Sequence, residues 1–469
     1  MMQQKAAIVI WFCAIAWAIG LQSLAVARDS KPNIVLIMAD DFGYEAVTAN
    51  GGESYKTPHL DAMAAGGMRF EHCYVQPVCT PTRVELMTGM SNVRNYIQFG
   101  VLDRKAKTFG HLLQEAGYAT GIAGKWQLGR EKDSPQHFGF DEAYLWQHTR
   151  RPPRYANPGL EYNGEERNFT NGEFGPDIIQ EFALDFIARH KEKPFFLYYP
   201  MMLTHAPYVP TPDSPEYDPK ATTEQGAGKK KFFADMTAYM DKQMGELLTK
   251  LDELGIRDDT LVIFLGDNGT GPGTVSQFKG SEYVGGKGMA SARGMHVPLI
   301  VNWPGHVSAG KVSEQLVGSV DFLPTICEAA GAKIPDDLTI DGVSFLPQLQ
   351  SEPADPEKVR YCWYSSPGGA VAKAEFAMTT GAKLYRDGRF FDLKADPFES
   401  QPISTEQLNA EEKNVSEKLQ GVLDSYANAR PEELKTALEP LSKKAKGGKP
   451  GKGKGKKARA RKRAQARQR

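Results

Sequence analysis

A cysteine at the start of a predicted helix is the most chemically informative feature of this sequence. Cys79 opens the run C-T-P-T-R-V-E-L-M-T-G, residues 79–89, which has the pattern C-x-P-x-R-x4-T-G. Thr80 suits the N-cap and Pro81 the first helical position, where no N–H bond is needed. Cys79 would then face the positive end of the helix dipole, where an anion binds favourably. Arg83 follows one turn later, so both side chains can point toward one site.

Acidic and amide side chains follow two apolar runs, 33–38 and 261–265, that are typical of strands buried on both faces. Ligands of open α/β sheets bind beyond the carboxyl ends of such strands. Three carboxylates and one amide oxygen suit a hard cation such as Ca2+ better than Zn2+. Each pair alone is more often a solvated loop or a turn, so the prediction depends on the two pairs together. The residues are Asp40, Asp41, Asp267 and Asn268.

Together these motifs resemble the sulfatase family, in which a maturation enzyme oxidises the signature cysteine to Cα-formylglycine. Thr82 and Met87 stand where serine and leucine are usual, and both departures are mild. The resemblance extends over residues 33–393, with five motifs in the expected order. It implies one bound divalent ion, expected to be Ca2+, whose ligands would be Asp40, Asp41, Asp267, Asn268 and the modified Cys79.

The resemblance also implies a catalytic set around the sulfate ester: Cys79, Arg83, Lys125, His205 and Lys287. Cleavage builds negative charge on the sulfate and leaving oxygens, so preorganised cations would supply much of the acceleration. One hydroxyl of the hydrated aldehyde would attack sulfur, and the second would later lose its proton so that sulfate is eliminated. His205, assisted by Lys287, would protonate the leaving oxygen, while Arg83 would hold the modified side chain.

One motif position departs from the family pattern. Gln127, in G-K-W-Q-L-G, stands where sulfatases usually have histidine. Glutamine can hydrogen-bond the diol but cannot exchange a proton near neutral pH, so elimination would need another base. His148 and His296 are candidates by residue type only. We therefore expect Gln127, His148 and His296 to contact the substrate.

Three alternatives remain open from the sequence. The chain could hydrolyse phosphate or phosphonate esters, because the wider superfamily shares the fold and metal site. It could also bind anionic glycans without catalysis, although every expected metal ligand is present. Finally, a disulfide between Cys73 and Cys79 would consume the thiol that the proposed chemistry needs.

Alternating apolar strands and amphipathic helices predict an α/β fold: a large, mostly parallel sheet sandwiched between helices. We expect a catalytic domain over residues 31–355 and, where shorter strands appear, a smaller C-terminal α+β subdomain over 356–440. Predicted strands cover 33–38, 118–123, 194–199, 261–265 and 298–302, then 361–364, 383–385 and 390–393. Predicted helices cover 58–65, 108–116, 177–190, 232–251, 319–330 and 405–426.

The two ends of the 469-residue chain predict its location and partners. Residues 1–27 have a basic start, an apolar stretch and an Ala-Val-Ala end, as in a signal peptide, so we expect a periplasmic or extracellular protein. Residues 441–469 hold 14 lysines and arginines and no acid, which predicts a disordered tail able to contact anionic polymers. No aromatic residue is interleaved, so specific nucleic-acid binding is not expected. The substrate would be a sulfated small molecule or glycan.

Overall fold

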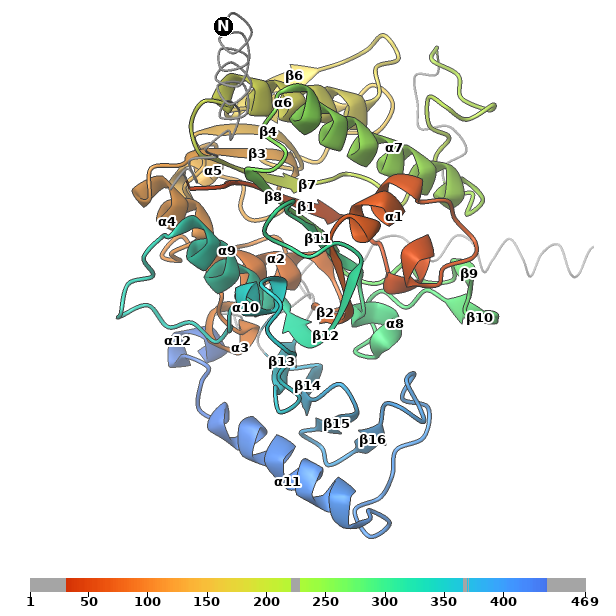
Figure 1. Ribbon diagram of the computed structural model, residues 1–469, viewed down its shortest axis with the longest axis vertical. Coiled ribbons are helices and arrows are strands. Elements are labelled where there is room, and N and C mark those ends of the chain that lie inside the picture. The colour runs from red at the N-terminus through yellow and green to blue at the C-terminus, as the bar shows by residue number, and fades with distance from the viewer. Residues whose placement is uncertain (1–30, 221–227, 366–368, 370, 437–469) are drawn as a thin grey trace, which may run out of the picture. The chain divides into compact units, whose positions relative to one another are not determined.

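A ten-stranded sheet supports the predicted site at the carboxyl ends of its central strands (Figure 1). The computed structural model describes residues 31–220, 228–365, 369 and 371–436. The strand order is β12 (Lys311–Gly318), β2 (Met68–Tyr74), β11 (Leu299–Asn302), β8 (Thr260–Gly266), β1 (Asn33–Ala39), β7 (Phe195–Pro200), β3 (Ala119–Lys125), β4 (Glu142–Trp146), β5 (Gly159–Tyr162) and β6 (Glu165–Asn168). The five strands from β8 to β4 are parallel, while β11, β5 and β6 join antiparallel neighbours.

The register of β1 and β8 brings the two acidic pairs together. The strands are parallel, and Ala39 pairs with Gly266 at their ends. The next residues, Asp40 and Asp267, therefore emerge side by side, and the Asp267 N–H donates to the Ala39 carbonyl over 2.9 Å. The two acidic pairs therefore lie at one edge of the sheet.

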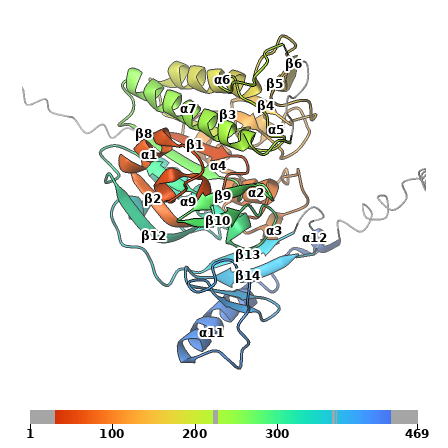
Figure 2. The same cartoon turned by 90° about the vertical axis from the view of Figure 1, so that its right-hand side faces the viewer.

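Helices cover both faces of the sheet, and β1 is apolar and buried at every position from Ile34 to Ala39. Ile34, Leu36 and Met38 belong to one core cluster, and Val35 and Ile37 to the other. Figures 1 and 2 show α6 and α7 over the second face and α2, α4 and α9 over the first. The predicted sandwich is therefore confirmed. The helix α1 also packs on the second face. The bounds of the covering helices are α1 (Pro58–Ala65), α2 (Cys79–Thr88), α4 (Phe109–Glu115), α6 (Gly175–His190), α7 (Phe232–Glu253) and α9 (Phe322–Ala330).

The helix that carries Cys79 begins earlier than predicted. We expected Thr80 to cap it, whereas α2 begins at Cys79 and Val78 occupies the N-cap position without a side-chain cap. The Thr80 hydroxyl instead accepts a hydrogen bond from the Gly100 N–H over 3.1 Å. Thr80 therefore ties the start of α2 to the loop at residues 97–104.

A four-stranded antiparallel sheet and one long helix form the C-terminal part. The helix α11 begins at Ala410, later than predicted, because Asn409 and Glu412 form a reciprocal capping box. Side chains of this part, such as Trp363 and Leu419, belong to the same core cluster as Phe322 of α9. The elements are β13 (Arg360–Tyr364), β14 (Ala374–Met378), β15 (Ala382–Tyr385), β16 (Phe390–Asp392) and α11 (Ala410–Ser425).

Short elements complete the described chain, including the antiparallel hairpin of β9 and β10. They are α3 (Asn92–Asn95), α5 (Ser134–His137), α8 (Ala292–Met295), α10 (Leu346–Leu349), α12 (Glu432–Thr436), β9 (Val275–Phe278), β10 (Ser281–Val284) and the 3-10 turns η1 (Tyr44–Ala46), η2 (Thr48–Asn50) and η3 (Ser319–Asp321). Among the described residues, no helix is both long and apolar enough to cross a bilayer. The predicted signal peptide and basic tail lie outside the described residues.

Candidate active site

Asp40, directly after β1, lies between two buried cations. The Lys125 Nζ, at the end of β3, is 2.7 Å from Asp40 Oδ1, and the Arg154 Nη1 is 3.2 Å from Oδ2. Burial alone would raise the pKa of Asp40, but Lys125, His205 and Arg154 hold it well below its ordinary value. Asp40 is therefore an anion at neutral pH.

Asp41 adopts a left-handed backbone, with φ of 61°, which aspartate tolerates better than most residues. Its N–H donates to Asp267 Oδ1 over 2.9 Å, which links the two acidic pairs. Its Oδ1 accepts from Asn268 Nδ2 over 2.9 Å and from the Lys287 ammonium. Burial opposes ionisation of Asp41, but Lys287 and His205 lower its pKa overall.

Arg83, one helical turn after Cys79 in α2, contacts the acidic cluster. Its guanidinium is fully buried, with Nη2 3.2 Å from Asp267 Oδ2 and Nη1 donating to the Lys125 carbonyl over 2.8 Å. Burial, followed by the charge of Asp40, raises the pKa of Asp267 to about 7 even though Lys125 and Arg83 oppose the shift. Of the three carboxyl groups in the cluster, Asp267 is the one whose ionised form the surrounding cations stabilise least. A bound cation would stabilise that ionised form.

The residues fit a divalent cation. Ligand atoms of Asp40, Asp41 and His205 lie within 4.8 Å of one another. Asn268 Oδ1 is buried and has no hydrogen-bond partner among the described residues, while its Nδ2 donates to Asp41 and to the Gly269 carbonyl. A buried amide oxygen without a hydrogen-bond partner, beside carboxylates, can serve as a ligand of an oxygen-coordinated cation.

Cys79 is almost fully buried at the start of α2, and it is not bonded to Cys73, since all four described cysteines are free. The backbone of the loop carrying Lys287 is held nearby, because the Gly288 N–H donates to the Pro77 carbonyl over 2.8 Å. Burial would lower the pKa of Lys287, but Asp41, Cys79 and Asp40 raise it above its ordinary value. Lys287 is thus an ammonium group that faces both residue 79 and the acidic cluster.

His205 follows β7 and contacts the cluster at its edge. Its Nε2 is 3.8 Å from Asp41 Oδ2, and its Nδ1 faces the Ala206 carbonyl. Burial lowers the pKa of His205 to about 4, although Asp41 and Asp40 oppose the shift. The ring is therefore neutral at pH 7. We assign the proton to Nδ1 from its carbonyl partner, which leaves the Nε2 lone pair toward the cluster.

Gln127 and His148 lie together, near the ends of β3 and β4. Gln127 has φ of 59°, and its Oε1 is buried without a partner among the described residues. His148 is buried, with Nδ1 3.2 Å from Glu161 Oε2 and Nε2 2.8 Å from the Glu131 carbonyl. The Glu131 carbonyl engages Nε2, whereas Nδ1 lies near the Glu161 carboxylate without forming a hydrogen bond among the described residues, and the contact of His148 with substrate stays a prediction.

His296 lies in an aromatic stack. Its ring is 4.0 Å from that of Tyr44 and 4.7 Å from that of Tyr74, nearly parallel to both. Its Nε2 is 2.8 Å from the Glu71 carbonyl, and burial lowers its pKa to about 3. Within the described part of the chain, His296 forms no hydrogen bond or ion pair with the acidic cluster, so its role in substrate binding is a prediction.

Arg154 is a site residue that was not predicted. It lies in the loop R-R-P-P-R-Y after β4, where an arginine is ordinarily solvated. Here it is buried, pairs with Asp40, and stacks over Trp146 with its guanidinium carbon 3.8 Å from the ring centre. No sequence motif indicated this contact, because it depends on how the loop folds back over β4.

Comparison with known proteins agrees with this geometry. A family model described as Sulfatase matches residues 32–332, and one described as N-sulphoglucosamine sulphohydrolase, C-terminal, matches residues 286–428. The chain is 32% identical over 436 residues to arylsulfatase A of Bos taurus, covering 83% of this chain and 81% of the relative. It is 34% identical over 361 residues to N-acetylgalactosamine-6-sulfatase of Homo sapiens, covering 69% and 67%.

The fold also matches a solved structure, that of Ps i-CgsB in complex with k-i-k-neocarrahexaose. The TM-score is 0.74 at 25% sequence identity, and the match covers 89% of this chain and 96% of the other. The predicted family and fold class are thereby confirmed. The chain belongs to the sulfatase family and is a sulfuric ester hydrolase.

Proposed function

We propose that this sulfatase cleaves sulfate esters of carbohydrates, using Cα-formylglycine made from Cys79 and one bound Ca2+. The observation that carries this proposal is the joint placement of Cys79, Arg83 and Lys287 around a buried set of three carboxylates and one unpaired amide oxygen. A set of this kind can hold a cation and an anionic ester side by side. In this buried environment, neither the cation nor the anionic ester would be stable unless the other were bound beside it.

The cation would be held by the side chains of Asp40, Asp41, Asp267, Asn268 and residue 79. When bound, a divalent ion would withdraw negative charge from the sulfate oxygens. Around it, Lys125 and Arg154 keep Asp40 ionised, and Lys287 does the same for Asp41. The protein thus supplies fixed carboxylates and fixed counter-charges before substrate arrives.

Residue 79, once oxidised, would supply the attacking hydroxyl of its hydrate. Arg83 is held at both ends of its guanidinium by Asp267 and the Lys125 carbonyl, so it would fix residue 79 with little reorganisation. Lys125 and Lys287 would contact sulfate oxygens. His205 would give a proton to the leaving oxygen of the sugar, a role for which it must first be protonated because burial leaves it neutral.

The substrate class and location are parts of the same proposal. Support for a carbohydrate comes from relatives named N-acetylgalactosamine-6-sulfatase and from the neocarrahexaose complex of a solved structure with the same fold. The sequence of residues 1–27 supports export to the periplasm or beyond, and the basic tail at 441–469 would hold the enzyme near anionic polymers. A formylglycine-generating enzyme is the implied maturation partner.

Sulfate release from carbohydrates tests the proposal. The enzyme should be produced with a formylglycine-generating enzyme and incubated with sulfated mono- and disaccharides, and released sulfate measured by ion chromatography. We expect Cys79→Ala to abolish release and Cys327→Ala, a change of a buried cysteine in α9, to retain it. Removing divalent ions with a chelator should abolish release, and Ca2+ should restore it. Faster hydrolysis of matched phosphate esters would instead support the phosphatase alternative.

A further inference from the structure

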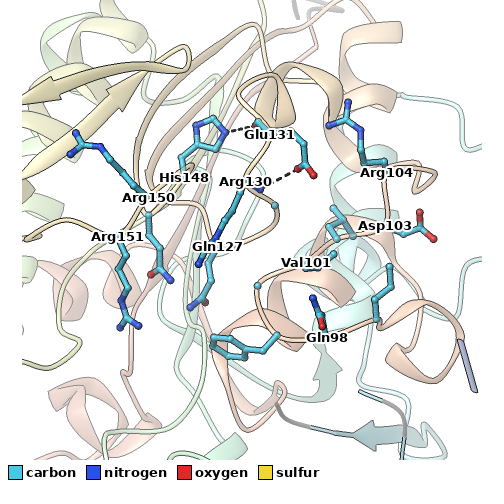
Figure 3. Close-up of a pocket in the computed structure, with 16 residues that line it drawn as sticks. Gln98, Val101, Asp103, Arg104, Gln127, Arg130, Glu131, His148, Arg150 and Arg151 are labelled. Carbon is cyan, nitrogen blue, oxygen red and sulfur yellow. Dashed lines mark hydrogen bonds between the residues drawn. The ribbon is translucent and has the colours of Figure 1, made fainter. Parts of the chain in front are cut away.

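A cavity of about 710 Å3 lies beside Gln127 (Figure 3). One wall is the loop at residues 97–104, and the other is formed by residues that follow β3 and β4. The Gly100 N–H in the first wall donates to the Thr80 hydroxyl, next to residue 79. Gln127 in the second wall follows Lys125 by two residues. The cavity therefore borders the candidate active site through both walls.

Two of the four arginines that line this cavity have acidic partners. Arg104 pairs with Asp133 at 2.9 Å, and Arg150 pairs with Glu166 at 3.2 Å. The other two, Arg130 and Arg151, are exposed and have no ion-pair partner among the described residues. Their charges are therefore available to a ligand.

The two arginines without an ion-pair partner among the described residues lie on one side of the cavity. Figure 3 shows Gln127, Arg130 and Arg151 on the side opposite the loop that carries Gln98 and Asp103. The two acids of the lining, Asp103 and Glu131, accept hydrogen bonds from nearby groups of the chain. Asp103 accepts from the Lys105 N–H over 2.9 Å, and Glu131 from the Ser134 hydroxyl and the Arg130 N–H over 3.0 and 3.1 Å.

Gln127 adds an acceptor to the same side. Only 7% of this residue is exposed, yet its Oε1 has no partner among the described residues. Gln147 Oε1, in the same lining, is also buried and has no hydrogen-bond partner among the described residues. Buried amide oxygens of this kind need donors, and sugar hydroxyls are donors of suitable size. Two guanidinium groups and two amide oxygens together match a sugar that carries an anionic group.

We propose that this cavity is a subsite for a second anionic group of the substrate, a sulfate or a carboxylate on a sugar next to the one that loses its sulfate. Arg130 and Arg151 would bind the anion through charge-assisted hydrogen bonds, and Gln127 would accept from a hydroxyl of the same sugar. The inference rests on the proposed function and narrows it: the preferred substrate is a carbohydrate with more than one negative charge. It also gives the substrate contact predicted for Gln127 a specific partner, a hydroxyl group of the neighbouring sugar.

Three disaccharides separate the alternatives: one with a single sulfate, one with a second sulfate on the neighbouring sugar, and one with a carboxylate there. The wild-type enzyme should have the higher kcat/KM on the two dianionic substrates. Arg130→Gln and Arg151→Gln should each reduce the ratio of dianionic to monoanionic kcat/KM by about tenfold, mainly through KM. Lys333→Gln removes an exposed charge away from the cavity and should leave the ratio unchanged. A larger effect on one dianionic substrate identifies the anion.

Binding to Cys79→Ala protein provides the second readout, measured by calorimetry with the same three disaccharides. Both arginine variants should weaken binding of a dianionic disaccharide about tenfold relative to the monosulfated one. An unchanged ratio in the Arg130→Gln/Arg151→Gln double variant, or an equal loss with Lys333→Gln, would overturn the subsite. Absence of sulfate release by the wild-type enzyme would contradict the proposed function instead, and the binding ratio would still decide the subsite.

Discussion

Each carboxylate of the site has its own counter-charge. Asp40 is paired with Lys125 and Arg154, Asp41 with Lys287, and Asp267 with Arg83. The pairings keep the first two acids ionised at a depth where a lone carboxylate would be protonated, while Asp267 keeps a pKa of about 7. The site thus holds a set of fixed charges, to which a bound cation and the anionic sulfate ester would add one further pair of opposite charges.

Residue types and spacing predicted most of this set, because each predicted residue follows a strand or belongs to a local motif. Arg83 follows Cys79 by one turn, and Asp267 follows an apolar run. Arg154 could not be predicted, since its contact with Asp40 bridges 114 residues and depends on a loop without regular structure. The stacking of Tyr44 and Tyr74 on His296 could not be predicted either, because both tyrosines are distant from His296 in the sequence.

Removing the Arg154 charge should destabilise the protein. Arg154→Gln leaves buried Asp40 with one cation and removes the stacking on Trp146, so we expect the free energy of unfolding to fall by about 2 kcal/mol. Urea unfolding followed by fluorescence measures this change. Arg389→Gln breaks an exposed pair with Asp387 and should cost less than about 1 kcal/mol. Equal costs would mean that the Arg154 pair contributes no more than a surface ion pair.

The role of His205 depends on the leaving group. A sugar alkoxide needs a proton as it leaves, whereas 4-nitrophenolate does not. We expect His205→Gln to reduce kcat for a carbohydrate sulfate on the order of 100-fold, and kcat for 4-nitrophenyl sulfate less than about tenfold. His306→Gln, at an exposed histidine stacked on Trp303, is the control. Equal losses on both substrates would show that His205 positions groups of the site and donates no proton to the leaving oxygen.

At the scale of elements, parallel strands place the site. Ala39 pairs with Gly266, and β3 lies beside β7, so loops far apart in sequence meet at one edge. Apolar runs predicted these strands to within one or two residues because burial on both faces leaves a continuous signal. The start of α2 was missed because side-chain capping preferences favoured Thr80, whereas the structure uses that hydroxyl to hold Gly100.

Close approach between β3 and β7 should make Gly124 irreplaceable. Its φ is 119°, and an added Cβ would lie 2.0 Å from the Pro200 carbonyl oxygen. We expect Gly124→Ala to lower the free energy of unfolding by more than about 3 kcal/mol and to displace Lys125. Gly255→Ala, at φ of 67° with open space around the new Cβ, should cost only about 1 kcal/mol. Similar thermal melting of the two variants would show that the contact between β3 and β7 can relax.

At the scale of the whole molecule, one buried acid should affect stability across the physiological pH range. Glu45 is 1% exposed, and burial raises its pKa from 4.5 to about 7. The folded state holds this proton more tightly, so its contribution to stability is complete below about pH 4.5 and falls as the pH rises to about 7. The full loss is roughly 3 kcal/mol.

Glu45→Gln should therefore match wild-type stability near pH 4.5 and exceed it by up to roughly 3 kcal/mol at pH 8, as measured by urea unfolding across that range. Glu282→Gln, at an exposed strand position, should show no such pH dependence relative to wild type. A constant difference between Glu45→Gln and wild type would mean that Glu45 is ionised or protonated equally in both states.

The chemical state of residue 79 decides whether this enzyme hydrolyses sulfate esters through formylglycine. Protein made with graded amounts of a formylglycine-generating enzyme should be digested, and the residue-79 peptide quantified by mass spectrometry alongside sulfate release from one disaccharide. We expect kcat to rise in proportion to the formylglycine fraction and to extrapolate to zero where only the thiol remains. Full activity in protein whose Cys79 is unmodified would contradict it.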